Sequence, residues 1–304
     1  MRIAIAGPAG NIGHRTSEKI IESGAETILL VRHPEKVSDL VSKGAIARSV
    51  SMDNATEIVE ASHEVDALFW LIPPKLDALN VREWHIQTGQ AGAAAALRNR
   101  INRVVLISSV GAGSSPNLGT ISFLGEVEAI FNEAAENVVA LRAGFFMENY
   151  FAQAHRIRDD AAFFFPFPEE HDLPFVSTDD IGDVAANYLL DTRWAGRWTR
   201  NLMGPTNLTP NETANIISGV WGRPVAYVQV AVESVLKLLE SMGATADVQA
   251  EFGNLFRAMC DPIGVYATAR TPEAFTPTTF EQFTRSKLLP HLGRESRAQA
   301  YSNS

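Results

Sequence analysis

The sequence predicts a doubly wound α/β fold, in which helices cover both faces of a parallel β-sheet, with a smaller α/β lobe toward the C-terminus. In the first half of the chain, runs that are apolar throughout alternate with amphipathic stretches. This alternation is typical of buried parallel strands joined by helices. Such crossovers are right-handed almost without exception. After about residue 150 the alternation ends, which indicates a second lobe.

Six strands are expected from their apolar composition, at residues 2–6, 26–31, 45–49, 67–72, 103–108 and 138–142. Five helices are expected between them, at residues 11–23, 34–43, 55–61, 84–99 and 124–132. Gly24 and Gly44 follow the first two helices directly, in the position where glycine commonly ends a helix. The helix over 84–99 is expected to be long because its sequence is rich in alanine.

The domain boundaries follow from this change of pattern: we assign residues 1–152 and 175–204 to the sheet domain, and residues 153–174 and 205–304 to the smaller lobe. The segment 175–204 is expected to return to the sheet domain through a helix that begins near Thr178. Residues 302–304 are expected to form a disordered tail. A cluster in the smaller lobe contains Phe163, Phe164, Phe165 and Phe167. This cluster could wall an aromatic pocket or form the core of the lobe, and core is the commoner fate of clustered phenylalanines.

The composition argues against several classes of protein. A formal net charge of -9 does not supply the concentrated positive surface that nucleic acids require. No apolar run approaches the roughly twenty residues of a membrane helix, and the N-terminus does not resemble a signal peptide. Cys260 is the only cysteine, so no internal disulfide can form, which fits a reducing cytoplasm. We therefore expect a cytoplasmic monomer or homodimer that binds neither nucleic acid nor membrane.

A glycine-rich turn follows the first strand and opens the first helix, with the sequence Gly7, Pro8, Ala9, Gly10, Asn11, Ile12 and Gly13. In this GxxGxxG pattern, Gly7 permits the tight turn, Gly10 lets the backbone approach a pyrophosphate, and Gly13 lets the helix pack close to the strand. Backbone N–H groups at the helix start, aided by the helix dipole, then hold the negative charge. A glycine-rich turn without a ligand is the simpler alternative. The complete strand–turn–helix context favours a dinucleotide-binding Rossmann fold.

The end of the second strand favours NADP(H), with NAD(H) as the alternative. Proteins that bind NAD usually carry an acidic residue here, which binds the ribose 2′-hydroxyl. This chain has Arg32, whose guanidinium can bind a 2′-phosphate bidentately and stack on adenine, and Lys36 can add a second positive charge. Two simpler interpretations stay open: Arg32 as a solvated loop residue, and Glu35 as the partner of Lys36.

With these features placed, the chain resembles the NmrA-like family of atypical short-chain dehydrogenases. The resemblance runs through most of the chain and rests on the glycine loop and on residues 31–32, 66–74, 103–109, 141–149, 179–185 and 222–225. The segment 141–149, with the sequence LRAGFFMEN, is the most specific of these. The resemblance implies an NADP-binding core and a small C-terminal lobe that together form a cleft.

The resemblance also implies where ligands lie. The nicotinamide half of the cofactor would lie beside Ile72, Pro73 and Pro74. The substrate side would be lined by Phe145, Phe146, Met147, Asn149 and Tyr150. Relatives divide into reductases of small molecules (quinones, dyes, enones, imines) and catalytically silent redox sensors.

The chain departs from the family pattern at its catalytic pair. Typical short-chain dehydrogenases carry a Tyr-x-x-x-Lys pair, in which the lysine lowers the pKa of the tyrosine so that it can donate a proton. We place Thr120 at the tyrosine position and Leu124 at the lysine position, and a shift by one residue, to Ile121 and Gly125, supplies neither group. Hydride transfer remains feasible for a substrate that is itself a good acceptor, because the cofactor carries the chemistry.

Few other side chains are candidates for catalysis. Ser108 and Ser109 end a strand at the carboxyl edge of the sheet, where ligands bind in such folds. We count Ser108 among the cofactor-binding residues and Ser109 as a weak catalytic candidate, with hydrogen bonding to local backbone as the alternative. His171 is a second weak candidate, as an acid near the expected cleft. The acidic residues after Ser177 are expected to cap a helix, and no metal site is expected.

The sequence therefore predicts an NADPH-dependent reductase of a small conjugated or aromatic acceptor: a quinone, enone, imine or dye. The substrate would lie between Pro73–Pro74 and Phe146–Met147, with solvent or Ser109 as the proton source. The alternative is a catalytically silent NADP(H)-binding sensor, in which cofactor binding changes the affinity for a regulatory protein partner. Loss of the Tyr-Lys pair favours the sensor, and the aromatic residues favour the enzyme.

Overall fold

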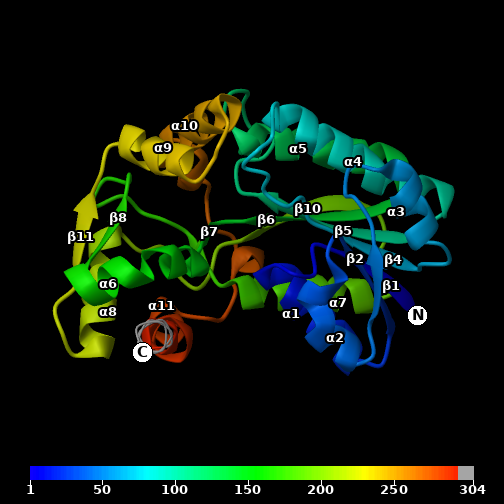
Figure 1. Ribbon diagram of the computed structural model, residues 1–304, viewed down its shortest axis with the longest axis horizontal. Coiled ribbons are helices and arrows are strands. Elements are labelled where there is room, and N and C mark those ends of the chain that lie inside the picture. The colour runs from blue at the N-terminus through cyan, green and yellow to red at the C-terminus, as the bar shows by residue number, and fades with distance from the viewer. Residues whose placement is uncertain (294–304) are drawn as a thin grey trace.

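The computed structural model describes residues 1–293 and is built around a seven-stranded sheet (Figure 1). The strands lie in the order β10-β6-β5-β4-β1-β2-β3. Their bounds are β1 (Arg2–Ala6), β2 (Glu26–Val31), β3 (Ile46–Ser49), β4 (Ala67–Trp70), β5 (Arg103–Ser109), β6 (Asn137–Ala143) and β10 (Arg197–Leu202). Every neighbouring pair of strands is parallel.

Helices cover both faces of the sheet, which confirms the doubly wound fold (Figure 1). One face carries α3 (Ala55–Ala61), α4 (Val81–Arg98) and α5 (Thr120–Ala134), and the other carries α1 (Asn11–Glu22), α2 (Ser38–Ser42) and α7 (Thr178–Leu190). Successive side chains of β1 point to opposite layers, as strand geometry requires. Ala4 packs in the α4/α5 layer and Ile5 in the α1/α7 layer. Because every central strand is buried on both faces, the sheet edge is where ligands can reach it.

Two of the helices begin earlier than the sequence predicted. α4 begins three residues earlier because Asn80 caps it, and the side chain of Asn80 accepts a hydrogen bond from the Glu83 N–H at 2.8 Å. α5 begins at Thr120, directly after Gly119, whose φ of +59° turns the chain sharply into the helix. Both starts are set by a residue outside the apolar pattern, and the pattern therefore missed them.

Two other elements are shorter than predicted. The helix expected over residues 34–43 is divided into a 3₁₀ turn (Pro34–Val37) and α2, because Val37 leaves the helical region with φ -127°. β4 ends at Trp70 and not at residue 72, since the chain there enters a loop that contains two prolines, which cannot donate to a sheet.

The smaller lobe lies beside the sheet domain (Figure 1). It contains the parallel strands β8 (Ala162–Phe165) and β11 (Ala226–Gln229) with the helices α6 (Ala154–Asp160) and α8 (Pro210–Trp221). Its core is aromatic. The ring of Phe145 meets those of Phe165 and Phe167 edge-on, with centroids 5.6 and 5.2 Å apart. Phe163 and Phe167 are fully buried, so these two members of the phenylalanine cluster form core.

The chain returns from the smaller lobe to the sheet domain through α9 (Val232–Ser241) and α10 (Ala246–Cys260) (Figure 1). Of these two helices, α10 contacts α4 and α5. The Asp247 carboxylate accepts a hydrogen bond from the Val81 N–H at 2.7 Å, and the Thr245 hydroxyl donates to the Ala78 carbonyl at 2.6 Å. A Cβ on Gly119 would lie 2.3 Å from the Glu251 carbonyl oxygen of α10. α10 is thus fixed directly over the start of α5.

Within residues 1–293, no helix combines the length and apolar character needed to cross a membrane. The predicted tail at residues 302–304 lies outside the described residues.

The packing between α4 and the sheet predicts the effect of one added methyl group. A Cβ on Gly92 would lie 2.6 Å from the Trp70 ring and 2.7 Å from the Phe131 ring. Because both rings are buried and cannot yield, Gly92→Ala is expected to lower the free energy of unfolding by about 1–3 kcal/mol in urea denaturation. The control Gly219→Ala adds the same methyl group to exposed space on α8 and is expected to stabilise by about 0.5–1 kcal/mol. Equal effects of the two substitutions would contradict this packing argument.

Candidate functional site

The glycine loop brings the start of α1 unusually close to the end of β1. Gly7 has φ +70°, which favours glycine, and this conformation turns the chain back over the strand. A Cβ on Gly13 would lie 2.2 Å from the Gly7 carbonyl oxygen, so no other residue fits at that position. The two glycines together fix where the N-terminus of α1 points.

The first backbone amides of α1 are left without protein acceptors. The N-cap residue Gly10 offers no side chain, and within residues 1–293 no acceptor is found for the N–H groups of Asn11 and Ile12. A Cβ on Gly10 would approach only the Gly7 carbonyl, at 3.7 Å, so internal packing does not exclude a side chain there. The loop therefore presents free donors and open space on one side. This arrangement fits a phosphate group.

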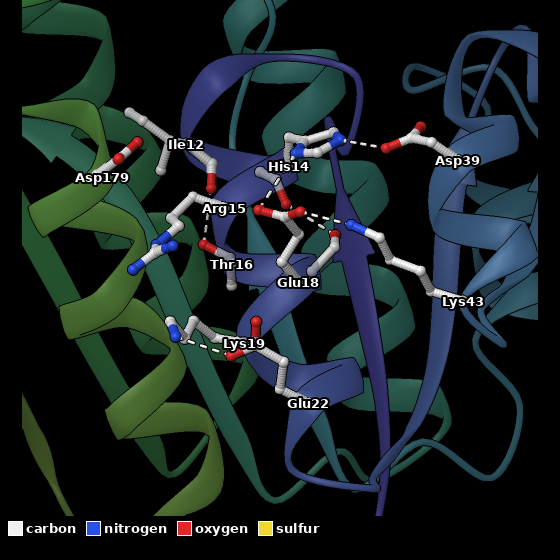
Figure 2. Close-up of polar contacts among 12 residues, drawn as sticks. Ile12, His14, Arg15, Thr16, Glu18, Lys19, Glu22, Asp39, Lys43 and Asp179 are labelled. Carbon is white, nitrogen blue, oxygen red and sulfur yellow. Dashed lines mark hydrogen bonds and ion pairs between the residues drawn. The ribbon is translucent and has the colours of Figure 1, made fainter. Parts of the chain in front are cut away.

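A hollow of about 380 Å³ opens at this loop. Its lining includes Gly10, Asn11, Arg15, Glu148, Asp179 and Lys287. Figure 2 shows the side chains that line its α1 side: His14 hydrogen-bonds Asp39 at 2.7 Å, and Glu18 accepts a hydrogen bond from Lys43 at 2.7 Å. Both contacts join α1 to α2 or to its C-cap residue, and they fix the position of the helix that follows the glycine loop.

Positive charge stands exposed at the end of β2. Within the described chain, the side chains of Arg32 and Lys36 make no hydrogen bond or ion pair. Glu35, the residue that could have paired with Lys36, lies 3.3 Å from the His33 ring instead. Next to them, the Ser51 hydroxyl hydrogen-bonds Asp53 and holds its pKa below the ordinary value, with smaller contributions from the charges of Lys75 and Arg32. Arg32 is therefore free to bind an added anion.

The loop after β4 is braced from α4. The indole N–H of Trp84 donates to the Pro73 carbonyl at 2.9 Å, and the Lys75 ammonium lies 4.8 Å from the centre of the Trp84 ring. Ile72 and Pro73 are half-buried and Pro74 is exposed, at the carboxyl edge of the sheet. These residues form a fixed and accessible wall where the sequence placed the nicotinamide.

A buried polar network lies at the carboxyl ends of β5 and β6. The Ser108 hydroxyl donates to Glu128 at 2.5 Å, and the Arg142 guanidinium donates to both oxygens of Glu128 at 2.9 and 2.6 Å. Ser108 and Glu128 are buried, whereas about a quarter of the Arg142 side chain is exposed. Ser108 was expected among the cofactor-binding residues, and its hydroxyl is instead committed to Glu128.

Thr120 and Leu124, the residues that the sequence analysis assigned to the catalytic pair, carry no titratable side chain. Thr120 and Leu124 lie in the first turns of α5, on the same side of the helix as Glu128, because residues four apart share a face. The Ser109 hydroxyl donates to the Val110 carbonyl at 3.1 Å, the local backbone contact that was its alternative interpretation. A Cβ on Gly111 would lie 2.6 Å from Val265, so the loop after β5 is closely covered by the smaller lobe.

The segment predicted to line the substrate pocket is divided between core and surface. Phe145, Met147 and Tyr150 are buried, and the Tyr150 hydroxyl bonds to Thr213 at 2.7 Å. Burial also raises the pKa of Tyr150 far above its ordinary value, and its hydroxyl is enclosed with Thr213 in the core of the smaller lobe. Only Phe146 and Asn149 of this set are partly exposed and can contact a ligand. The structure places the side chains of Phe145, Met147 and Tyr150 in the core of the smaller lobe.

His171 also lies in the core of the smaller lobe. Its Nε2 atom hydrogen-bonds the Met259 carbonyl at 2.8 Å, and its ring stacks on Phe167. The residue is 8% exposed. The ring that was expected to act as an acid in the cleft is thus enclosed, and its bonded nitrogen faces backbone. Cys260 is half-buried, and burial raises the pKa of its thiol to about 11, which fits an unreactive cysteine.

The acidic residues at the start of α7 have structural partners. Ser177 caps the helix by accepting a hydrogen bond from the Asp179 N–H, as predicted. Asp180 accepts two hydrogen bonds from Thr278, and Asp183 is bound bidentately by Arg15. These contacts join α7 to the C-terminal segment on one side and to α1 on the other.

Four polar residues of the site were missed in the sequence: Glu128, Arg142, Glu148 and Lys287. Glu128 lies on the face of α5 that Thr120 and Leu124 occupy, eight residues after the tyrosine position, and that spacing could have revealed it. Lys287 lines the hollow at the glycine loop although it lies more than 270 residues further along the chain. No local pattern could have predicted that placement.

The family is identified by a match along nearly the whole sequence and not by a single motif. The sequence model of the NmrA-like family matches residues 1–283. The chain belongs to the NmrA-like family. This NmrA-like protein is 24% identical over 287 residues to the NAD(P)H azoreductase of Xenophilus azovorans, an alignment that covers 93% of this chain and 97% of that one.

Two solved structures share the fold of this NmrA-like protein. The triphenylmethane reductase of Citrobacter sp., complexed with NADP(H), has a TM-score of 0.77 at 18% identity and covers 94% of this chain and 99% of its own. The NADPH-dependent quinone oxidoreductase of Escherichia coli, complexed with NADPH, has a TM-score of 0.72 at 20% identity and covers 98% and 99%. At these identities the likeness establishes the fold.

The network at the carboxyl edge predicts a stability difference between single and double substitutions. Arg142→Met leaves Glu128 buried without its partner and is expected to lower the free energy of unfolding by about 3 kcal/mol in urea denaturation. In the double variant Glu128→Met/Arg142→Met no buried charge remains, so most of that loss is expected to be regained. A double variant that is less stable than Arg142→Met would show that the unpaired charge of Glu128 is not the cause of the loss.

Proposed function

We propose that this protein is an NADPH-dependent oxidoreductase that reduces a small conjugated or aromatic acceptor (a quinone, enone, imine or dye) without a Tyr-Lys pair. The observation that carries the proposal is the glycine loop, where the free N–H groups of Asn11 and Ile12 and the open space at Gly10 fit a pyrophosphate. The relationship to the azoreductase, which covers almost all of both chains, supports reductase chemistry.

Three parts of the chain would hold the cofactor. The start of α1 would bind the pyrophosphate, Arg32 and Lys36 would bind the 2′-phosphate of NADP(H), and Ile72–Pro74 would support the nicotinamide. Arg32 suits this role because it is exposed and its side chain has no hydrogen-bond or ion-pair partner within residues 1–293. When bound, NADPH supplies a hydride from its nicotinamide ring.

The residues at the carboxyl edge limit the class of acceptor. No tyrosine or lysine stands on α5 to donate a proton, and Arg142 is committed to Glu128 by two hydrogen bonds. The side chains would therefore orient the acceptor, and any proton would come from solvent or from Ser109. This suits acceptors that take a hydride without prior protonation, such as quinones and conjugated or cationic systems. Phe146 and Asn149 would contact such an acceptor from the smaller lobe.

The direct test is NADPH oxidation, followed at about 340 nm against a panel of quinones, azo dyes, enones and iminium compounds, beside a binding titration. Turnover with a member of the panel is expected.

Gly10→Val should abolish both binding and turnover, because its side chain would fill the space for the phosphate. The variant should fold normally, since the φ of -92° at Gly10 suits any residue. Tight binding without turnover across the panel would favour the alternative, a silent NADP(H)-binding sensor. Absence of binding would reject both.

The choice of cofactor depends on Arg32. Arg32→Ala is expected to weaken NADPH binding about 10- to 100-fold, the value of charge-assisted hydrogen bonds to a phosphate, and to change NADH binding by less than about twofold. The control Arg98→Ala removes an equally exposed arginine from the end of α4, at the opposite edge of the sheet, and should affect neither cofactor. Isothermal titration of both cofactors decides this. Equal losses for NADPH and NADH would reject the assignment of Arg32.

A further inference from the structure

A lysine from the C-terminal segment enters the hollow at the glycine loop. Lys287 lies in a π-helical turn (Thr284–Leu288), a conformation that is rare and frequent at functional sites. Its ammonium lies 2.6 Å from Asp179 and 3.7 Å from Glu148, and one third of its side chain is exposed. It lines the same hollow as Gly10 and Asn11.

The other basic side chains of the hollow are already bound by carboxylates. Arg15 donates to both oxygens of Asp183 at 2.6 and 2.9 Å, and His14 hydrogen-bonds Asp39 at 2.7 Å. Figure 2 shows His14 turned toward α2. Arg15 is held against α7 by this pairing, and His14 is held against α2.

The ammonium group of Lys287 has N–H donors that Asp179 does not occupy. An ammonium group has three N–H donors, and Asp179 takes one of them. Glu148 is too distant for a hydrogen bond to Lys287, and it accepts hydrogen bonds from the Ser177 hydroxyl at 3.2 Å and the Thr178 N–H at 3.0 Å. Donors of Lys287 therefore remain available to the hollow, on a flexible side chain that can follow a ligand.

We propose that Lys287 binds the pyrophosphate of the dinucleotide and so couples the C-terminal segment to cofactor binding. This inference rests on the proposed function and adds a binding residue that comes from outside the Rossmann core. Because NADPH and NADH share the pyrophosphate, Lys287 should act on both cofactors alike, whereas Arg32 acts on the 2′-phosphate alone.

A second way for Lys287 to act must be separated from direct contact. Asp179 and Glu148 are carboxylates beside the hollow, and Lys287 could help an anion to bind merely by neutralising them. Removing Lys287 would weaken binding in either case. Removing Asp179 as well restores the charge balance but not the contact, so the double variant tells the two apart.

The experiment is isothermal titration with two fragments, adenosine diphosphate for the pyrophosphate and 2′-adenosine monophosphate for the 2′-phosphate. Lys287→Met is expected to weaken binding of the diphosphate about tenfold or more and to leave the 2′-monophosphate unchanged. Lys287→Arg should retain most of the affinity, because it keeps the charge and the donors. NADPH and NADH should lose affinity by the same factor in Lys287→Met.

The double variant Lys287→Met/Asp179→Asn decides the mode of action. Affinity for the diphosphate as low as in Lys287→Met supports contact, and recovery to the wild-type value overturns it in favour of charge compensation. Wild-type affinity in a folded Lys287→Met protein overturns the inference and leaves the proposed function intact. Failure of the wild-type protein to bind either fragment overturns both.

Hydrogen exchange gives a readout that a purely structural lysine would not change. Adenosine diphosphate is expected to protect the amides of residues 280–288 in the wild-type protein but not in Lys287→Met. Protection that persists in the variant would show that the segment responds to the ligand without this contact, and would overturn the proposed coupling.

Discussion

The close approach of α1 to β1 at the glycine loop is the constraint on which the rest of the site depends. Because a Cβ on Gly13 would lie 2.2 Å from the Gly7 carbonyl oxygen, the helix can start where it does only without a side chain there. The same small-residue packing continues at Gly182 of α7, where a Cβ would lie 2.8 Å from Arg15. α1 thus packs against both the sheet and α7, and its first residues line the hollow that Lys287 of the C-terminal segment also lines.

The carboxyl edge of β5 and β6 holds polar side chains that bind one another. Ser108 and Arg142 both donate hydrogen bonds to Glu128. A network of this kind fixes the strand ends and the loop that follows β5, at the cost of offering no free acid. α10 packs over the start of α5 and covers part of this edge. An edge that can hold and orient a substrate but offers no free acid is consistent with a reaction in which the cofactor and a reactive acceptor supply the chemistry.

The fold was predictable because its signals are local. Apolar strands, helix-ending glycines and the glycine loop are each readable within about a dozen residues, and the structure has the corresponding elements. The side-chain part of the site was less predictable. Tyr150 and His171 have residue types that suit a cleft, but tertiary packing gives them buried partners in Thr213 and Met259. The approach of Lys287 to Asp179 depends on where the last segment docks, which no local pattern encodes.

The central claim, that this chain directs hydride transfer from NADPH, is tested most directly by the stereochemistry of cofactor oxidation. NADPH deuterated at C4 on one face or on the other would be oxidised with an acceptor, and the deuterium left in NADP⁺ measured by mass spectrometry. A protein that fixes the nicotinamide against Ile72–Pro74 should remove the label from one stereoisomer completely and leave it in the other. Loss from both isomers, or tight binding with no oxidation of either, would contradict the account.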